Sequence, residues 1–266
     1  MYSASDHTFV ICAYKENPYI EDTIRSLKAQ TVLGSIILST STPNTYLENV
    51  CRKHEIKMIV NDRPGLAGDD WNYGYDHAET SLVTMAHQDD YYDPKYLERF
   101  LEELNKYDSA EVSLLFSDYY ELRNGGTVSD NSLLKVKRVM NAPLANSRLN
   151  GSMFWKRRVL SLGCSICCPS VLLVKPVAGP SVFDTTYRNS CDYKTWVDLA
   201  SKEGRFVYIA DRLMGHRIYE ESATSKNLGE NIRRGEDLQI LQTLWPAPIA
   251  RGVNALYAQS EKSNQL

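Results

Sequence analysis

Short apolar runs alternate with amphipathic segments through the first 120 residues, and this alternation restricts the fold more than any other feature. Five runs are expected to be strands, at residues 8–13, 35–38, 57–60, 82–86 and 112–117. The segments between them place apolar residues at helical spacing, as in 19–30, where Ile20, Ile24 and Leu27 share one face. Such alternation predicts a parallel, doubly wound α/β sheet. Right-handed crossovers then place the loops that follow the strands at one edge of the sheet.

After the tight turn Asn124-Gly125-Gly126 the alternation stops. We expect helices near 132–140, 152–160 and 191–203, strands at 172–174 and 206–210, and a helical end over 235–257 that is interrupted at WPAP. The chain therefore divides into residues 1–124, 125–225 and 226–266 within one domain.

Charge is distributed unevenly along the 266 residues. The net charge of -3 gives no general attraction to nucleic acid, so we expect no nucleic-acid partner. Residues 131–183 contain no Asp or Glu and carry +8, which leaves -11 for the remainder, since -3 minus 8 is -11. This basic segment predicts either contact with an anionic membrane surface or a solvated basic face without a function.

The first residues show no basic region followed by a long apolar run, so we expect no secretory signal and a cytoplasmic protein. The longest apolar run, 159–174, is broken by Gly163 and Pro169 and is shorter than the roughly 20 residues of a spanning helix. The cysteines should then be reduced. Cys164, Cys167 and Cys168 form a CxxCC group without a second ligand pair at zinc spacing, and we expect buried packing for it.

The stretch LVTMAHQDDYYDP, residues 82–94, runs from a buried strand directly into a polar cluster. Ligands of open α/β sheets bind beyond the carboxyl ends of strands, and adjacent carboxylates there can hold a divalent cation. Asp89 and Asp90 are therefore candidate metal ligands, with a loop of solvated acids as the alternative. Asp93-Pro94 precedes a helical pattern, so Asp93 is expected to be a structural N-cap.

Familiar nucleotide motifs are absent. Without GxxxxGK[ST] or GxGxxG, neither a P-loop ATPase nor a dinucleotide enzyme is expected. Tyr14, at the end of the first strand, could stack on a base or be an interfacial core tyrosine. His216 follows the strand expected at 206–210 and is a further candidate ligand.

Five segments occur in an order that resembles the family 2 glycosyltransferases of GT-A fold. They are FVICAYKENPYIEDTIRSLKAQT, GLAGDDWNYG, HQDDYYDPKYL, SCDYKTWVDLA and HRIYEESAT, and they extend from Thr8 to Thr224. The resemblance implies a GT-A fold, with a mostly parallel central sheet flanked by helices. It also implies a donor-binding half over 1–124, an acceptor-binding half with the catalytic base over 125–225, and a helical tail over 226–266.

The family's D-x-D motif, whose last carboxylate binds Mn²⁺ or Mg²⁺ on the donor diphosphate, corresponds here to His87-Gln88-Asp89. The resemblance implies Asp89 as metal ligand, with Asp90 beside it and His87 in the place of a ribose-contacting Asp. Ser39-Thr40 replaces a pair of acids, and Asp70-Trp71-Asn72 replaces Ala-Arg-Asn, so that Arg63 is the candidate for the missing arginine. The implied donor-binding residues are Ala13, Tyr14, Glu16, Ser39, Arg63, Asn72, His87, Gln88 and Asp89.

Asp192 matches the second acid of a Glu-Asp pair, which the resemblance implies to be the general base, and Cys191 replaces the Glu. The family's Tyr-Arg-x-His appears as His216-Arg217-Ile218-Tyr219. Tyr219 thus occupies the ligand position, and His216, displaced by three residues, is kept as the third metal ligand after Asp89 and Asp90.

The implied function is inverting, metal-dependent transfer of a sugar from a nucleoside diphosphate sugar, UDP- or dTDP-linked, to a hydroxyl of a glycan or lipid-linked glycan. Such a step belongs to cell-surface polysaccharide synthesis at the inner face of the plasma membrane. A sugar-1-phosphate nucleotidyltransferase is one alternative, but such an enzyme is expected to have a glycine-rich basic loop after the first strand, where this chain has AYKENP. A non-catalytic nucleotide- or glycan-binding module of the same fold is the other.

Overall fold

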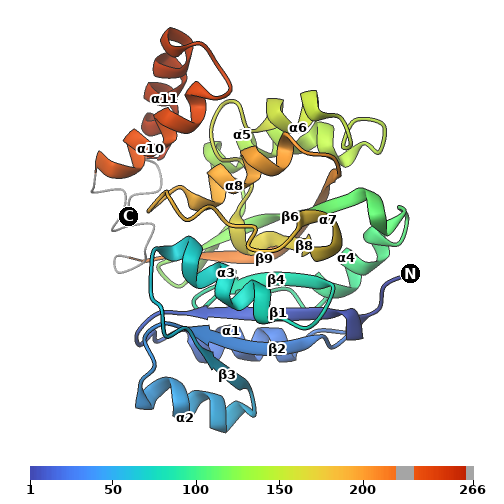
Figure 1. Ribbon diagram of the computed structural model, residues 1–266, viewed down its shortest axis with the longest axis vertical. Coiled ribbons are helices and arrows are strands. Elements are labelled where there is room, and N and C mark those ends of the chain that lie inside the picture. Colours follow the sequence, from blue (N-terminus) through green and yellow to red (C-terminus); the bar gives the residue numbers. More distant parts are fainter. Residues whose placement is uncertain (220–230, 262–266) are drawn as a thin grey trace.

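The computed structural model describes residues 1–219 and 231–261, and one sheet of nine strands runs through this part of the chain (Figure 1). The order across the sheet is β3-β2-β1-β4-β8-β6-β9-β5, and β7 pairs with β6. The strands are β1 (His7–Ala13), β2 (Ser35–Thr40), β3 (Lys57–Val60), β4 (Leu82–His87), β5 (Tyr91–Tyr92), β6 (Val112–Arg123), β7 (Gly126–Val128), β8 (Val171–Val174) and β9 (Arg205–Ile218).

Most strands of the sheet run in one direction, as predicted. β3, β2, β1 and β4 pair in parallel, and so do β6 and β9. β8 lies between β4 and β6 and is antiparallel to both, so β6 has the direction of β4. Of the described strands only β5, β7 and β8 are reversed. The result is a mixed α/β sheet.

Helices cover both faces of the sheet. Because side chains alternate along a strand, Phe9 and Ile11 of β1 join one core with α1, α2 and α4, whereas Val10 joins the other core with α3 and α8. The helices are α1 (Ile20–Lys28), α2 (Thr45–His54), α3 (Ala67–His77), α4 (Tyr96–Leu104), α5 (Ser132–Asn141), α6 (Met153–Val159), α7 (Lys175–Ala178), α8 (Cys191–Ala200), α10 (Asn231–Gln242) and α11 (Ala247–Glu261).

The two C-terminal helices pack against each other beyond α8 (Figure 1). Ile240 and Leu241 of α10 are fully buried and belong to the same apolar core as Trp196 of α8. The tail therefore shares a core with the segment before it, and the division of the chain at residues 124 and 225 stays a prediction. Residues 220–224 of the HRIYEESAT segment lie outside the described residues, as do 225–230 at the junction with the tail.

Two local expectations were wrong. β9 continues to Ile218 because it pairs with β6 along its length, so His216 lies inside a strand rather than after one. The helix after Pro94 begins at Tyr96 with Lys95 as N-cap, and Asp93 instead accepts a hydrogen bond from the backbone N–H of Lys95 on its Oδ1 (2.9 Å). Asp93 is thus structural but is not the cap.

Candidate active site

The end of β4 meets the end of β9 at Asp90, a fully buried carboxylate. Its Oδ1 lies 3.0 Å from Nδ1 of His216 and accepts a hydrogen bond from the backbone N–H of Arg217 (2.9 Å). Its Oδ2 lies 3.8 Å from Nδ1 of His87 and has no hydrogen-bond partner within the described residues. Thr23 of α1 donates to the backbone carbonyl of Asp90 (2.7 Å). Asp90 therefore joins β4, α1 and β9.

Opposite charges determine the ionisation of this pair. Burial opposes ionisation of Asp90, but the charge and hydrogen bond of His216 outweigh it, so the pKa of Asp90 is lowered. Burial likewise disfavours the imidazolium of His216, but Asp90 and Asp89 raise its pKa above the ordinary value. The two residues form an ion pair whose members stabilise each other's charge.

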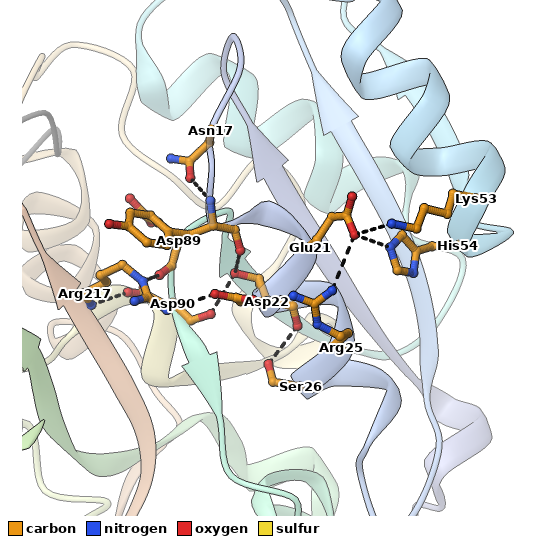
Figure 2. A network of polar contacts seen from close by, with 12 residues as sticks. Asn17, Glu21, Asp22, Arg25, Ser26, Lys53, His54, Asp89, Asp90 and Arg217 are labelled. Atoms are coloured by element: carbon orange, nitrogen blue, oxygen red, sulfur yellow. Dashed lines mark hydrogen bonds and ion pairs between the residues drawn. The ribbon is translucent and has the colours of Figure 1, made fainter. Parts of the chain in front are cut away.

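Asp89 has a different environment. Burial and the neighbouring charge of Asp90 raise its pKa. Its Oδ2 accepts a hydrogen bond from the hydroxyl of Tyr219 (2.8 Å), which in turn accepts one from Nδ2 of Asn17 (2.8 Å). Arg217 donates through Nε to the backbone carbonyl of Asp89 (2.8 Å), and Figure 2 shows its side chain reaching toward the end of β4. Oδ1 of Asp89 makes no hydrogen bond to a residue that the structure describes.

Asp89, Asp90 and His216, the predicted metal ligands, do not form a three-ligand group in the described residues, and their roles as ligands stay a prediction. No group of three or more His, Cys, Asp or Glu side chains in residues 1–219 and 231–261 is arranged to hold a metal ion. The reason is that Asp90 and His216 are bonded to each other. Asp89 still fits a cation, because burial beside Asp90 raises its pKa and one of its oxygens has no hydrogen-bond partner among the described residues. Magnesium-type sites commonly use one or two carboxylates together with substrate phosphates.

The loop after β1 is held by Gln88. Its Oε1 accepts a hydrogen bond from the backbone N–H of Tyr14 (3.0 Å), and its Nε2 donates to the carbonyl of Tyr14 (3.1 Å). The Tyr14 side chain is 56% exposed. The next residue, Lys15, is left-handed with φ of 57° and donates its N–H to Oγ1 of Thr42 (2.6 Å). The side-chain amide of Gln88 thus fixes the backbone that presents the Tyr14 ring.

The remaining expected donor residues differ in accessibility. Both amide atoms of Asn72 bond to the backbone of Phe183, at 2.8 Å each, so this side chain links α3 to the loop before α8. Ser39 is buried where Gly74 of α3 approaches β2. Ala13 is the buried last residue of β1, whereas Glu16 and Arg63 are exposed.

His87 ends β4 and lies against Trp71 of α3, with 5.3 Å between the ring centroids. Trp71 also contacts Phe183, again at 5.3 Å. Nε2 of His87 is buried without a hydrogen-bond partner among the described residues. An aromatic pair thus lies between the end of β4 and α3.

Asp192 lies half-buried in the first turn of α8, and its Oδ1 accepts a hydrogen bond from the backbone N–H of Tyr193 (2.8 Å). Its Oδ2 has no hydrogen-bond partner in the described part of the chain.

Cys167, which the sequence predicted to be packing only, has a shifted pKa. Burial raises the pKa of the half-buried Cys167 thiol; Lys137 opposes this, and the charges of Asp90 and Asp192 raise the pKa further. The raised pKa keeps the thiol in its neutral form.

Most cations of the basic segment 131–183 bind groups of the protein itself. Arg138 pairs with Asp118 (2.6 Å), and Lys156 donates to two backbone carbonyls at 2.6 Å each. The others held in this way are Lys137, Arg157, Arg158 and Lys175. Lys135 and Arg148 are the two exposed cations of the segment without such a bond in the described residues. The excess of charge in this sequence segment is therefore not an equal excess at the surface.

The chain matches the model of a known family. The model of Glycosyl transferase family 2 matches residues 8–172, more than half of the chain. This range contains Asp89 and ends before Asp192.

Two curated relatives are glycosyltransferases described as uncharacterized. The one from Rickettsia typhi is 23% identical over 240 residues, which is 90% of this chain and 70% of the relative. The one from Rickettsia conorii is 25% identical over 194 residues, 71% of this chain but 30% of the relative.

Solved structures show the same fold. The mannosyltransferase PcManGT from Pyrobaculum calidifontis, in complex with GDP-Man and Mn²⁺, has a TM-score of 0.66 at 11% identity and covers 97% of this chain and 73% of its own. S. aureus TarS 1-349 in complex with UDP-GlcNAc has a TM-score of 0.64 at 12% identity, over 98% of this chain and 73% of its own. The predicted GT-A fold is thereby confirmed. Among the described helices, none has the length and apolar character needed to cross a membrane.

Proposed function

The chain belongs to Glycosyl transferase family 2, and from this membership and the carboxylates of Asp89 and Asp192 we propose an inverting, metal-dependent transfer of a sugar from a nucleoside diphosphate sugar to a hydroxyl. UDP- or dTDP-linked donors are favoured, and the acceptor is a glycan or lipid-linked glycan of cell-surface polysaccharide synthesis. The observation that carries the proposal is that Asp89, just after β4, and Asp192, in the first turn of α8, each have one carboxylate oxygen without a hydrogen-bond partner in the described residues.

The donor would bind across the ends of β1 and β4. The exposed Tyr14 ring is suited to stacking on the base, and Gln88, directly after β4, supports it. His87 precedes Asp89 by two residues and offers a ring nitrogen without a hydrogen-bond partner in the described part of the chain. Asn72 supports the site through Phe183, and Ala13, Glu16, Ser39 and Arg63 stay predicted donor residues.

Asp89 would hold Mn²⁺ or Mg²⁺, and His216 is the second candidate ligand through Nε2, since its Nδ1 faces Asp90. As a ligand it would be the neutral imidazole, without the Nε2 proton that it carries in the ion pair. A bound cation would neutralise charge on the leaving diphosphate. Asp90 then acts as the carboxylate that orients the histidine rather than as a ligand. PcManGT was crystallised with GDP-Man and Mn²⁺, which supports a donor and a cation of this kind.

Asp192 would be the general base. Its Oδ2, which no described residue occupies, accepts the proton of the acceptor hydroxyl while that oxygen bonds to the anomeric carbon. The bond from the anomeric carbon to the diphosphate oxygen breaks, and its electron pair leaves with the diphosphate. Attack from the face opposite the diphosphate inverts the configuration at that carbon.

A cytoplasmic reaction at the inner face of the plasma membrane, with contact through residues 131–183, stays part of the proposal. Lys135 and Arg148 are the exposed cations that would carry it. Flotation with vesicles that contain anionic lipid tests this point, and the absence of binding at physiological salt would remove it.

A thermal-shift panel of UDP-, GDP- and dTDP-sugars, with and without Mn²⁺, tests the donor. We expect one nucleotide class to raise the melting temperature and Mn²⁺ to enlarge the shift. Release of the nucleoside diphosphate from the selected sugar then distinguishes an enzyme from a binding module. Binding without release on any acceptor glycan would contradict the proposed reaction, and a shift that Mn²⁺ does not change would contradict its metal dependence.

A further inference from the structure

Two consecutive acids of α10 are turned toward the start of α8. The carboxylate of Glu236 accepts three hydrogen bonds from consecutive backbone N–H groups, those of Arg188 (2.8 Å), Asn189 (2.9 Å) and Ser190 (3.0 Å). Asp237 is 2% exposed, and its Oδ1 accepts a hydrogen bond from the Ser190 hydroxyl (2.8 Å). These contacts join residues 46 to 48 positions apart in the sequence.

The helix that they meet has no cap of the usual kind. Ser190 occupies the N-cap of α8, yet its side chain makes no capping hydrogen bond, because its hydroxyl is directed to Asp237. A serine at this position normally accepts a hydrogen bond from an N–H of the first turn. The backbone leading into α8 therefore depends on α10. Asp192 is the second residue of this helix.

The hairpin of α10 and α11 is itself anchored to the body at several points. Trp245 donates through Nε1 to the carbonyl of Ser161 (2.6 Å), and the guanidinium of Arg158 lies 4.8 Å from the Trp245 ring centroid. Arg157 donates to the carbonyl of Thr243 (2.9 Å). Buried Ile240 and Leu241 complete the attachment. Because the hairpin is held in place, its two acids can hold in place the groups that they bind.

We propose that the hairpin positions the general base: Glu236, assisted by Asp237, fixes residues 188–190 and so sets where α8 places the Asp192 carboxylate. The inference rests on the proposed function, since it takes Asp192 as the base. Glu236 is a positioning residue and touches neither substrate. Small displacements of a catalytic group can cost about 10²-fold in rate, which makes such a contact consequential.

The test compares Glu236→Ala and Glu236→Gln with Gln239→Ala, an exposed position on the same helix. Hydrogen–deuterium exchange with amide resolution follows the N–H groups of residues 188–190. Calorimetry with UDP and Mn²⁺, or with the nucleotide that the panel selects, gives the dissociation constant, and turnover of the selected nucleotide sugar gives kcat.

We expect Glu236→Ala to speed exchange at these three amides at least about tenfold, by loss of their acceptor, and to lower kcat about 10- to 100-fold. The nucleotide dissociation constant should stay within about twofold, because the donor side shares no residue with this contact. Glu236→Gln keeps one acceptor oxygen and should be intermediate, and Gln239→Ala should match the wild type.

Unchanged exchange in Glu236→Ala would overturn the contact itself, whatever the activity. Faster exchange with unchanged kcat, or with an equal loss of nucleotide binding, would overturn the positioning role and leave a general stabilising contact. Full turnover in Asp192→Asn, measured alongside, would instead overturn the assignment of the base and the inference with it, while the exchange data would still report the contact.

Discussion

The two carboxylates of the site are held in contrasting ways. Asp89 follows a strand of the parallel part of the sheet, and its position is set by strand pairing between β4 and β1. Asp192 begins a helix whose leading backbone is bound by side chains from the end of the chain. The proposed metal side thus combines strand pairing with side-chain contacts from β9, such as the Asp90–His216 pair, whereas the proposed base side depends on side chains of α10. We expect the base side to be the more sensitive of the two to substitutions in α10.

The largest effect is expected for Asp192→Asn. The amide cannot accept the acceptor's proton, so kcat should fall about 10³-fold, while the nucleotide dissociation constant stays within about twofold. Steady-state turnover and calorimetry measure the two quantities. Asp198→Asn, on the same helix in a surface pair with Lys194, is the matched control. A parallel loss of nucleotide binding would show that the two sides of the site are not separable.

Asp90→Asn tests the metal side through stability. The substitution leaves His216 without its charged partner in a buried location, and the free energy of unfolding should fall by about 3 kcal/mol. Urea unfolding followed by fluorescence measures this change. Asp62→Asn, at an exposed position, should change it by less than about 0.5 kcal/mol. If the two variants are equally stable, Asp90 does not hold β9 to β4.

Lys156 makes the stability of the folded protein depend on pH. Its side chain is 1% exposed, and burial lowers its pKa to about 8. An unfolded lysine titrates near pH ~10.4. Between these values the unfolded chain binds a proton that the folded chain does not, so stability rises with pH. The free energy of unfolding of the wild type, relative to that of Lys156→Met, should therefore rise by about 1 to 3 kcal/mol between pH ~8 and pH ~10.4. Below this range the difference between the two proteins should not depend on pH.

Urea midpoints across this pH range measure the Lys156 effect. Lys135→Met, which removes an exposed lysine, should give a constant difference from wild type. A constant difference for Lys156→Met as well would mean that the two carbonyls bound by its ammonium keep it charged throughout.

The smallest effect is expected for Gln88→Ala. Loss of the two hydrogen bonds to Tyr14 should weaken nucleotide binding about fivefold, or about 1 kcal/mol, by freeing the backbone that presents the ring. If Gln88 acts only by holding Tyr14, the double variant Gln88→Ala/Tyr14→Ala should bind the nucleotide about as weakly as Tyr14→Ala alone. Calorimetry measures the nucleotide dissociation constant of the wild type, the two single variants and the double variant. Fully additive losses of binding free energy would argue for a direct contact of Gln88 with the nucleotide.

Sequence periodicity was sufficient for the parallel part of the sheet. Lys57–Val60 was predicted to the residue, and β1, β2 and β4 differ from prediction by one or two residues. β9 was underestimated because residues 211–218 contain charged residues and a glycine, which look like a loop, although pairing with β6 makes them a strand. Local pattern carries no information about that partner.

The candidate site stays a prediction, and the sequence indicated only part of its geometry. The abrupt end of a buried strand pointed to Asp89 and Asp90 together, because the pattern does not show that Asp90 contacts His216 of a strand 126 residues away. The basic segment looked like a charged surface because a sequence does not show which cations bind internal carbonyls and acids. Glu236 gave no signal, since an acid on an amphipathic helix is expected to be solvated.

The place of β8 in the sheet has a consequence for the order of folding. β4 and β6 share no ladder in the described residues, and each pairs instead with three of the four residues of β8. The parallel unit of β1 to β4 can thus form from the first 87 residues of the chain. Strands β6 and β9 join this unit only when Val171–Val174 inserts between β4 and β6. The contact between β4 and β8 has a long sequence separation and is therefore slow to form. A nascent chain would carry a finished donor-side scaffold and an open sheet edge at β4 until that insertion, and this edge is where misassembly should begin.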